Sequence, residues 1–108
     1  MSEKAFVVEL NDESEYQRLL PGEPKTRGMK SGRVYLQAGQ DCGQHSTEAR
    51  EEMLIFLAGQ GKAIIDEQQD LEVGIGKVAY IGPHTIHNIK NTGSKPLIYI
   101  YCVASVKS

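Results

Sequence analysis

The sequence predicts an all-β fold in a single domain, either a sandwich or a barrel. Several runs of about five to seven residues are rich in β-branched and aromatic side chains, and they recur at near-regular spacing. Between them lie short segments with turn chemistry, namely AGQG, DEQQD, GIG, GPHT and NTGSKP. A chain of 108 residues is long enough for one modest hydrophobic core.

The expected strands follow one another along the chain with one long interruption. The polar stretch 11–28 contains Pro21 and Pro24, so we expect a loop there, with a helical turn around residues 13–19. The final run, LIYIYCVA at 97–104, is strongly β-prone. The other expected strands are AFVVEL at 5–10, RVYLQAG at 33–39, LEVGIG at 71–76, KVAYIG at 77–82 and IHNIKN at 86–91.

The stretch 46–66 is compatible with two structures. A helix is favoured by Ser46 and Thr47 as N-cap residues, by the acidic residues that follow them, and by Gly59 as a C-cap residue. Against the helix, residues 53–58 are apolar on every side, and a Gly-rich turn then leads into a second β-prone run. We therefore expect a hairpin, EMLIFL–AGQG–KAIID, with STEARE as the loop before it.

Composition and charge exclude several classes of protein. With 12 basic and 14 acidic residues the net charge is -2, which gives no reason to expect nucleic acid or an anionic membrane as partner. The N-terminus is charged and does not resemble a signal peptide, and no apolar run approaches the roughly 20 residues of a bilayer span. Cys42 and Cys102 are then expected to be reduced thiols in the cytoplasm.

Two motifs resemble those of the cupin family. The first family motif, G-x5-H-x-H-x3,4-E-x6-G, resembles the segment marked by Gly39, His45, Thr47, Glu52 and Gly59, in which Thr47 departs from the motif's second histidine. The second, G-x5-P-x-G-x2-H-x3-N, is similar to the segment marked by Gly76, Gly82-Pro83-His84, His87 and Asn91. Two independent motifs in the right order make the resemblance specific.

The resemblance implies a cupin-type jelly-roll β-barrel. Residues 33–104 would form the barrel core, 1–32 an N-terminal strand and loop arm of the same domain, and 105–108 a tail. Many small cupins are homodimers. A homodimer is also expected here because residues 53–57 and 97–102 are apolar on both faces, and only one face can fill the barrel.

The resemblance further implies one divalent transition metal (Fe, Zn, Mn, Ni, Co or Cu) inside the barrel. Carried over by position, the family's ligands correspond to His45, Glu52 and His87, while Thr47 replaces the second histidine of the first motif. Two imidazoles and one carboxylate with open positions suit such metals. In the alternative without a metal, His45 and Glu52 pair with each other and His87 binds a backbone carbonyl.

Neighbouring polar residues leave further alternatives open. Glu48 and Glu51 are other candidates for the carboxylate, although Glu52 fits the spacing to Gly59 better. Thr47 is expected on the inner face, where a water molecule could bridge it to the metal. His84 is expected to be an exposed loop residue, with a fourth ligand or an acid/base as the alternative. Cys42 is expected to be partly buried, with a weak zinc-type partner of His45 as the alternative, and Cys102 is expected in the core. The tyrosines could face the substrate or point outward, namely Tyr35, Tyr99 and Tyr101.

Three functions are compatible with these residues. The first is a metal-dependent enzyme acting on a small organic molecule in the barrel, by dioxygenation, isomerisation, decarboxylation or a lyase step. The second is a non-catalytic barrel that binds a small molecule or a metal. The third is a metal that only stabilises the fold. A fold does not determine a substrate, so none is assigned from the sequence, and the catalytic residues stay unassigned.

Overall fold

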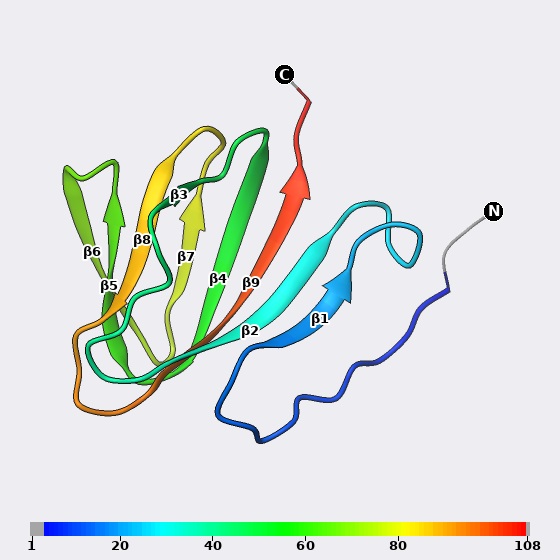
Figure 1. Cartoon of the computed structure of the whole chain (residues 1–108). Helices are drawn as coiled ribbons and strands as arrows, with labels where there is room; N and C mark the ends of the chain where they lie inside the picture. Colours follow the sequence, from blue (N-terminus) through cyan, green and yellow to red (C-terminus); the bar gives the residue numbers. More distant parts are fainter. Residues whose placement is uncertain (1–3, 108) are drawn as a thin grey trace.

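The computed structural model describes residues 4–107 and contains two antiparallel β-sheets. Figure 1 shows the two sheets facing each other, as in a jelly roll. The strands of the described residues are β1 (Gln17–Pro21), β2 (Lys30–Leu36), β3 (His45–Ser46), β4 (Arg50–Ala58), β5 (Gln60–Ile65), β6 (Gln69–Gly74), β7 (Val78–Ile81), β8 (Ile86–Asn91) and β9 (Leu97–Ser105). No helix occurs among these residues, which confirms the all-β prediction.

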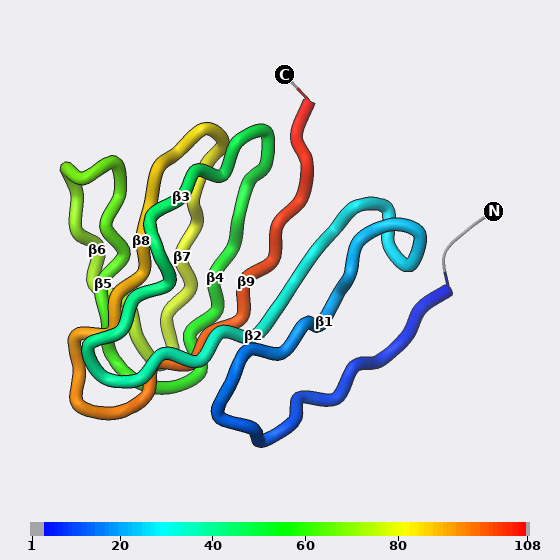
Figure 2. Tube along the Cα trace, in the orientation of Figure 1, coloured from blue at the N-terminus to red at the C-terminus, as the bar shows by residue number. Residues whose placement is uncertain are grey.

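The strand order places segments that are distant in sequence side by side. One sheet has the order β1-β2-β9-β4-β7 and the other has β3-β8-β5-β6. The C-terminal strand β9 lies between β2 and β4 in the first sheet, which is visible in the trace of Figure 2. The two family-like segments of the sequence each contribute a strand to both sheets, and they lie side by side there, β3 beside β8 and β4 beside β7.

The stretch 46–66 forms strands, as predicted, but the predicted hairpin is wrong. Strand β4 pairs with β7 and β9, whereas β5 pairs with β6 and β8 in the opposite sheet. Gly59 makes the crossing possible, with φ of 86° and with backbone atoms of Pro96 where a Cβ would lie. The helix considered for this stretch is excluded by the same strand pairing.

The N-terminal region also differs from the prediction. Residues 5–10 are not a strand, and the expected helical turn is replaced by β1, which pairs with β2. Arg33 accounts for part of this arrangement. Its buried guanidinium donates to the Asn11 side chain and to the backbone carbonyls of Asn11, Glu13 and Glu15. The Gln17 side chain adds hydrogen bonds to the Glu9 carbonyl and the Asn11 amide, and the chain before β1 extends along β1 in Figure 1.

The barrel interior is filled by alternate residues of the strands. In β4, the residues Glu52, Leu54 and Phe56 are buried, while Met53 and Leu57 point outward and are exposed. The buried hydrophobic core consists of Leu36, Leu54, Phe56, Ala63, Val73, Ile81, Ile89, Leu97 and Tyr99. Within residues 4–107, no helix has the length and apolarity that a bilayer span requires.

Candidate metal centre

The two histidines of the site come from neighbouring strands of one sheet. His45 opens β3 and His87 lies in β8, and the strand register pairs these two residues directly. Side chains of paired residues share a face, so both rings point into the barrel, with centroids 4.2 Å apart. The antiparallel pairing of β3 with β8 thus brings together two histidines that lie 42 positions apart in the sequence.

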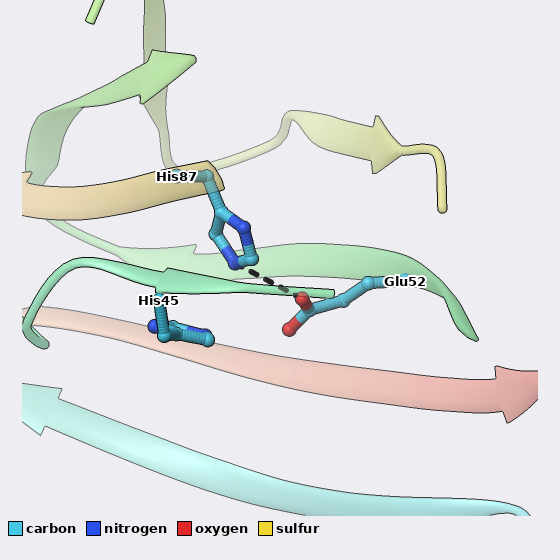
Figure 3. Close-up of side chains that lie close together, drawn as sticks. All are labelled: His45, Glu52 and His87. Carbon is cyan, nitrogen blue, oxygen red and sulfur yellow. Dashed lines mark ion pairs between the residues drawn. The ribbon is translucent and has the colours of Figure 1, made fainter. Parts of the chain in front are cut away.

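The carboxylate comes from the opposite sheet. Glu52 lies near the start of β4, and its Oε1 is 3.2 Å from Nε2 of His87. One ligand atom from each of His45, Glu52 and His87 can be chosen so that all three lie within 4.8 Å of one another. Figure 3 shows the three side chains converging from their separate strands. His87 and Glu52 are buried, whereas His45 is exposed at the edge of the group.

Both rings are oriented by a backbone carbonyl two residues earlier in the chain. Nδ1 of His45 is 2.9 Å from the carbonyl oxygen of Gly43, and Nδ1 of His87 is 3.1 Å from that of Thr85. In the neutral ring, this hydrogen bond assigns the proton to Nδ1 and leaves the lone pair on Nε2. Such outer hydrogen bonds are typical of metal-binding histidines.

The environment of His87 favours its protonated form when no metal is bound. Burial lowers the pKa of His87, but the hydrogen bonds to the Glu52 carboxylate and the Thr85 carbonyl outweigh burial, so its pKa lies above the ordinary value of 6.5. The His87–Glu52 contact is thus an ion pair below that pKa. A metal ion would have to displace this proton.

The other acidic candidates and His84 lie elsewhere. Glu51 points to the outer face, where its carboxylate accepts a hydrogen bond of 2.9 Å from the Tyr80 hydroxyl. Glu48 and His84 are exposed turn residues with positive φ. Glu52 is therefore the carboxylate that meets the histidines, and His84 is the exposed loop residue that was expected.

Thr47 lies at the cavity, but its hydroxyl is committed to the backbone. It donates to the Gly82 carbonyl at 2.7 Å and accepts from the Thr85 amide at 3.0 Å. This buried side chain therefore ties the end of β3 to the turn before β8. At the position of the family's second histidine, this chain therefore has a threonine whose hydroxyl links two backbone groups.

A cavity of about 340 Å³ extends from the three side chains toward the barrel mouth. Tyr99 and Tyr101 line it, which resolves their orientation, while Tyr35 lies on the opposite face of β2 from the lining residue Val34. Burial raises the pKa of both lining tyrosines, so both remain neutral hydrogen-bond donors. The full lining is Lys30, Val34, Cys42, His45, Ser46, Thr47, Arg50, Glu52, His87, Ile89, Tyr99, Tyr101 and Val103.

Cys42 also faces the cavity, as a partly buried thiol. Its sulfur accepts a hydrogen bond from the Ile89 amide at 3.3 Å, and burial raises its pKa. Cys42 is not among the described side chains whose possible ligand atoms converge with those of His45 and His87. Cys102 is only partly buried, and both cysteines are free.

Residues 32–103 match the protein family described as Cupin domain. The chain belongs to the cupin family. The family assignment and the two-sheet architecture agree with the jelly-roll expectation from the motifs. No curated protein sequence matches this cupin.

Solved structures support the same fold. The Cnp3 cupin domain of Schizosaccharomyces pombe has a TM-score of 0.76 and 18% identity, with 84% of this chain and 64% of that chain covered. A predicted oxalate decarboxylase from Thermotoga maritima has a TM-score of 0.70 and 19% identity, covering 93% and 100%. The Cupin_2 domain of an XRE family transcriptional regulator from Enterobacter cloacae has a TM-score of 0.73 and 13% identity, with 85% of this chain and 96% of that chain covered.

Sequence reasoning missed the two cationic residues that line the cavity, Lys30 and Arg50. Arg50 had a readable signal, because it precedes Glu52 by two positions on the same strand and therefore shares its face. Lys30 had no such signal in the sequence, because its position at the cavity depends on the pairing of β2 with β9.

Proposed function

We propose that this cupin binds one divalent transition metal through His45, Glu52 and His87, and that the metal centre acts on a small organic molecule in the barrel cavity. The observation that carries the proposal is the convergence of the three side chains from β3, β4 and β8, with both imidazole Nδ1 atoms already bound to carbonyls. A purely structural pair would not need the exposed third member, His45.

The three side chains have the chemistry that a divalent transition metal requires. Two imidazoles and one carboxylate suit Fe, Zn, Mn, Ni, Co or Cu, and the side chains leave open positions toward the cavity. When bound, the metal would supply a Lewis acid, and in redox-active forms an electron donor, for dioxygenation, isomerisation, decarboxylation or a lyase step.

The chain's own residues would bind and orient the substrate. Tyr99 and Tyr101 stay neutral and can donate hydrogen bonds, and Val34, Ile89 and Val103 provide an apolar wall. Glu52 is the one carboxylate among the described lining residues. A proton transfer to a carboxylate within the cavity would therefore have to use Glu52.

Elemental analysis of protein purified without added metal tests the metal centre. We expect about one equivalent of a transition metal, and a strong loss in His45→Ala, Glu52→Ala and His87→Ala. His84→Ala is the matched control, because it removes an exposed imidazole three positions from His87. Metal retained in all three ligand variants, or lost equally from the control, would refute the assignment.

The second candidate function is a non-catalytic barrel that binds a small molecule or a metal. It is favoured by the lack of a second carboxylate among the described lining residues, and by the similar fold of a domain from a transcriptional regulator. Metal-loaded protein incubated with ligands that it binds distinguishes the two functions. Turnover of a bound ligand supports the enzyme, and recovery of every bound ligand unchanged supports the binding barrel.

We also propose that the protein works in the cytoplasm. The free thiols of Cys42 and Cys102 are consistent with a reducing compartment. Cell fractionation with an antibody against the chain would test this directly, and recovery in an oxidising compartment would contradict it.

A further inference from the structure

Two cationic side chains stand at the mouth of the cavity. Lys30 and Arg50 both line it, and both are exposed, whereas Glu52 and His87 at its inner end are buried. The cavity therefore has a polarity along its length. Two of the three candidate metal-binding side chains, Glu52 and His87, lie at the buried end, and two positive charges lie at the open end.

The strand register explains why these cations face inward. Lys30 of β2 pairs with Val103 of β9, and Val103 pairs in turn with Glu52 of β4. Directly paired residues project on the same face of a sheet, so Lys30 shares the inner face with Glu52. Arg50 shares this face as well, because it lies two residues before Glu52 in β4.

Neither cation is neutralised within the described part of the chain. In residues 4–107, no ion pair or side-chain hydrogen bond is formed by Lys30 or Arg50, and the Lys30 stem lies over Gly22. One acidic residue, Glu23, lines an adjoining depression together with Lys30, Arg50 and Ser105. The mouth thus carries two positive charges and one negative charge.

The spacing sets the size of the ligand. Residues two apart on a strand are separated by about 7 Å, and residues two strands apart by about 10 Å. A molecule that reaches from the metal centre to the cations must therefore be a few carbon atoms long. The cavity volume of about 340 Å³ accommodates such a molecule but not a polymer.

We propose that the cavity binds a small organic dianion of about four or five carbon atoms. One carboxylate is bound at the metal centre, and the second anionic group is bound between Lys30 and Arg50. The carbon chain lies along Val34, Ile89 and Val103. This inference rests on the proposed metal centre for one end of the ligand, and on the two cations alone for the other end.

Calorimetric titration of zinc-loaded protein provides the test. Succinate and glutarate should bind at least about tenfold more tightly than acetate or the monoamide of succinate, because only the dianions reach both ends. Lys30→Gln and Arg50→Gln should each reduce this preference about fivefold, a typical effect of removing one partly solvated charge contact. Arg50→Lys should retain most of it.

Lys77→Gln is the matched control, since it removes an exposed positive charge in the turn before β7, away from the cavity lining. Thermal melting establishes that each variant is folded. Equal affinity for succinate and acetate in the wild type, or a preference that survives in the Lys30→Gln/Arg50→Gln double variant, would overturn the proposal.

The design separates this inference from the proposed metal centre. Metal content is measured first, and absence of metal refutes the proposed function alone. Succinate binding by the metal-free protein is then measured with the same variants. Binding that depends on Lys30 and Arg50 supports the cationic end of the site, and absence of binding there overturns it.

Discussion

His87 controls how the metal centre should respond to pH. Its folded-state pKa lies above 6.5, so the proton that a metal must displace is held to a higher pH than in a free histidine. We expect zinc affinity to begin to fall at a higher pH than the ordinary histidine value would set, by roughly tenfold per pH unit for each displaced proton. Competition with a chelator between about pH 5 and 8.5 measures this dependence.

The metal-free protein should show the opposite trend. A raised folded-state pKa means that protonated His87 stabilises the fold fully below its unfolded value, and this contribution is lost as pH rises through the folded value. Chemical denaturation of metal-free wild type and His87→Gln would reveal it. A zinc affinity that stays constant down to about pH 5 would contradict a ligand role for His87.

Thr47 should contribute to stability rather than to metal binding. Its hydroxyl bridges the Gly82 carbonyl and the Thr85 amide, and Thr47→Val would leave both without that partner in a buried position. We expect a loss of about 1–3 kcal/mol in the free energy of unfolding. Thr47→Ser keeps the hydroxyl and should lose less, as measured by urea denaturation.

Zinc affinity provides the second readout for Thr47. It should change little in folded Thr47→Val, because the hydroxyl is already used by the backbone. A large loss of zinc affinity without a loss of stability would instead indicate that Thr47 interacts with the metal, directly or through water.

The candidate site was predictable from spacing, but its supporting contacts were not. His45, Glu52 and His87 could be chosen because motif positions report which residues meet in a barrel. The carbonyls of Gly43 and Thr85 that orient the rings are backbone atoms and carry no side-chain signal. The use of the Thr47 hydroxyl depends on a turn that becomes its neighbour only after folding.

At the scale of elements, Gly59 determines where the chain passes from one sheet to the other. Gly59→Ala would combine an unfavourable φ of 86° with a clash against the Pro96 and Leu97 backbone. Left-handed backbone at a residue with a Cβ costs about 1–2 kcal/mol, and an overpacked contact adds about 1–3 kcal/mol. We expect a loss of several kcal/mol, measured by urea denaturation.

Gly39→Ala is the matched control for this crossing. Gly39 has a similar φ of 84°, but nothing lies within 4 Å of an added Cβ. Gly39→Ala should lower the free energy of unfolding only by the cost of the left-handed backbone, about 1–2 kcal/mol. Equal losses in the two variants would mean that the close approach of Pro96 does not constrain the crossing.

The positions of most strands follow from local sequence, whereas their pairing does not. Runs such as those in β4, β5 and β9 have the side chains that favour strands whatever their neighbours are. Pairing is a long-range property, and the short Gly-containing link between β4 and β5 has the same local features in a hairpin and in a crossing between sheets. The strand β1 was missed because its pairing with β2 outweighs a polar, proline-flanked sequence.

At the scale of the whole molecule, the outer face of the five-stranded sheet carries an exposed apolar patch at its β7 edge. Met53 and Ile55 of β4 pair with Tyr80 and Val78 of β7, and these outward-facing residues continue into β9. Val78 and Tyr80 are each 63% exposed. An exposed apolar patch of this kind is typical of a protein–protein interface.

We propose that a second copy of the chain covers this face, as a homodimer. A twofold contact places the same patch on both subunits, so one acidic substitution in the patch introduces two like charges into the interface. Val78→Glu should therefore convert the dimer into a monomer of 11.9 kDa, as measured by light scattering coupled to gel filtration. Ile75→Glu is the control, because Ile75 is similarly exposed at 61% but lies in the turn after β6. Wild type that is monomeric at micromolar concentration, or a Val78→Glu variant that remains dimeric, would show that this face is not the subunit contact.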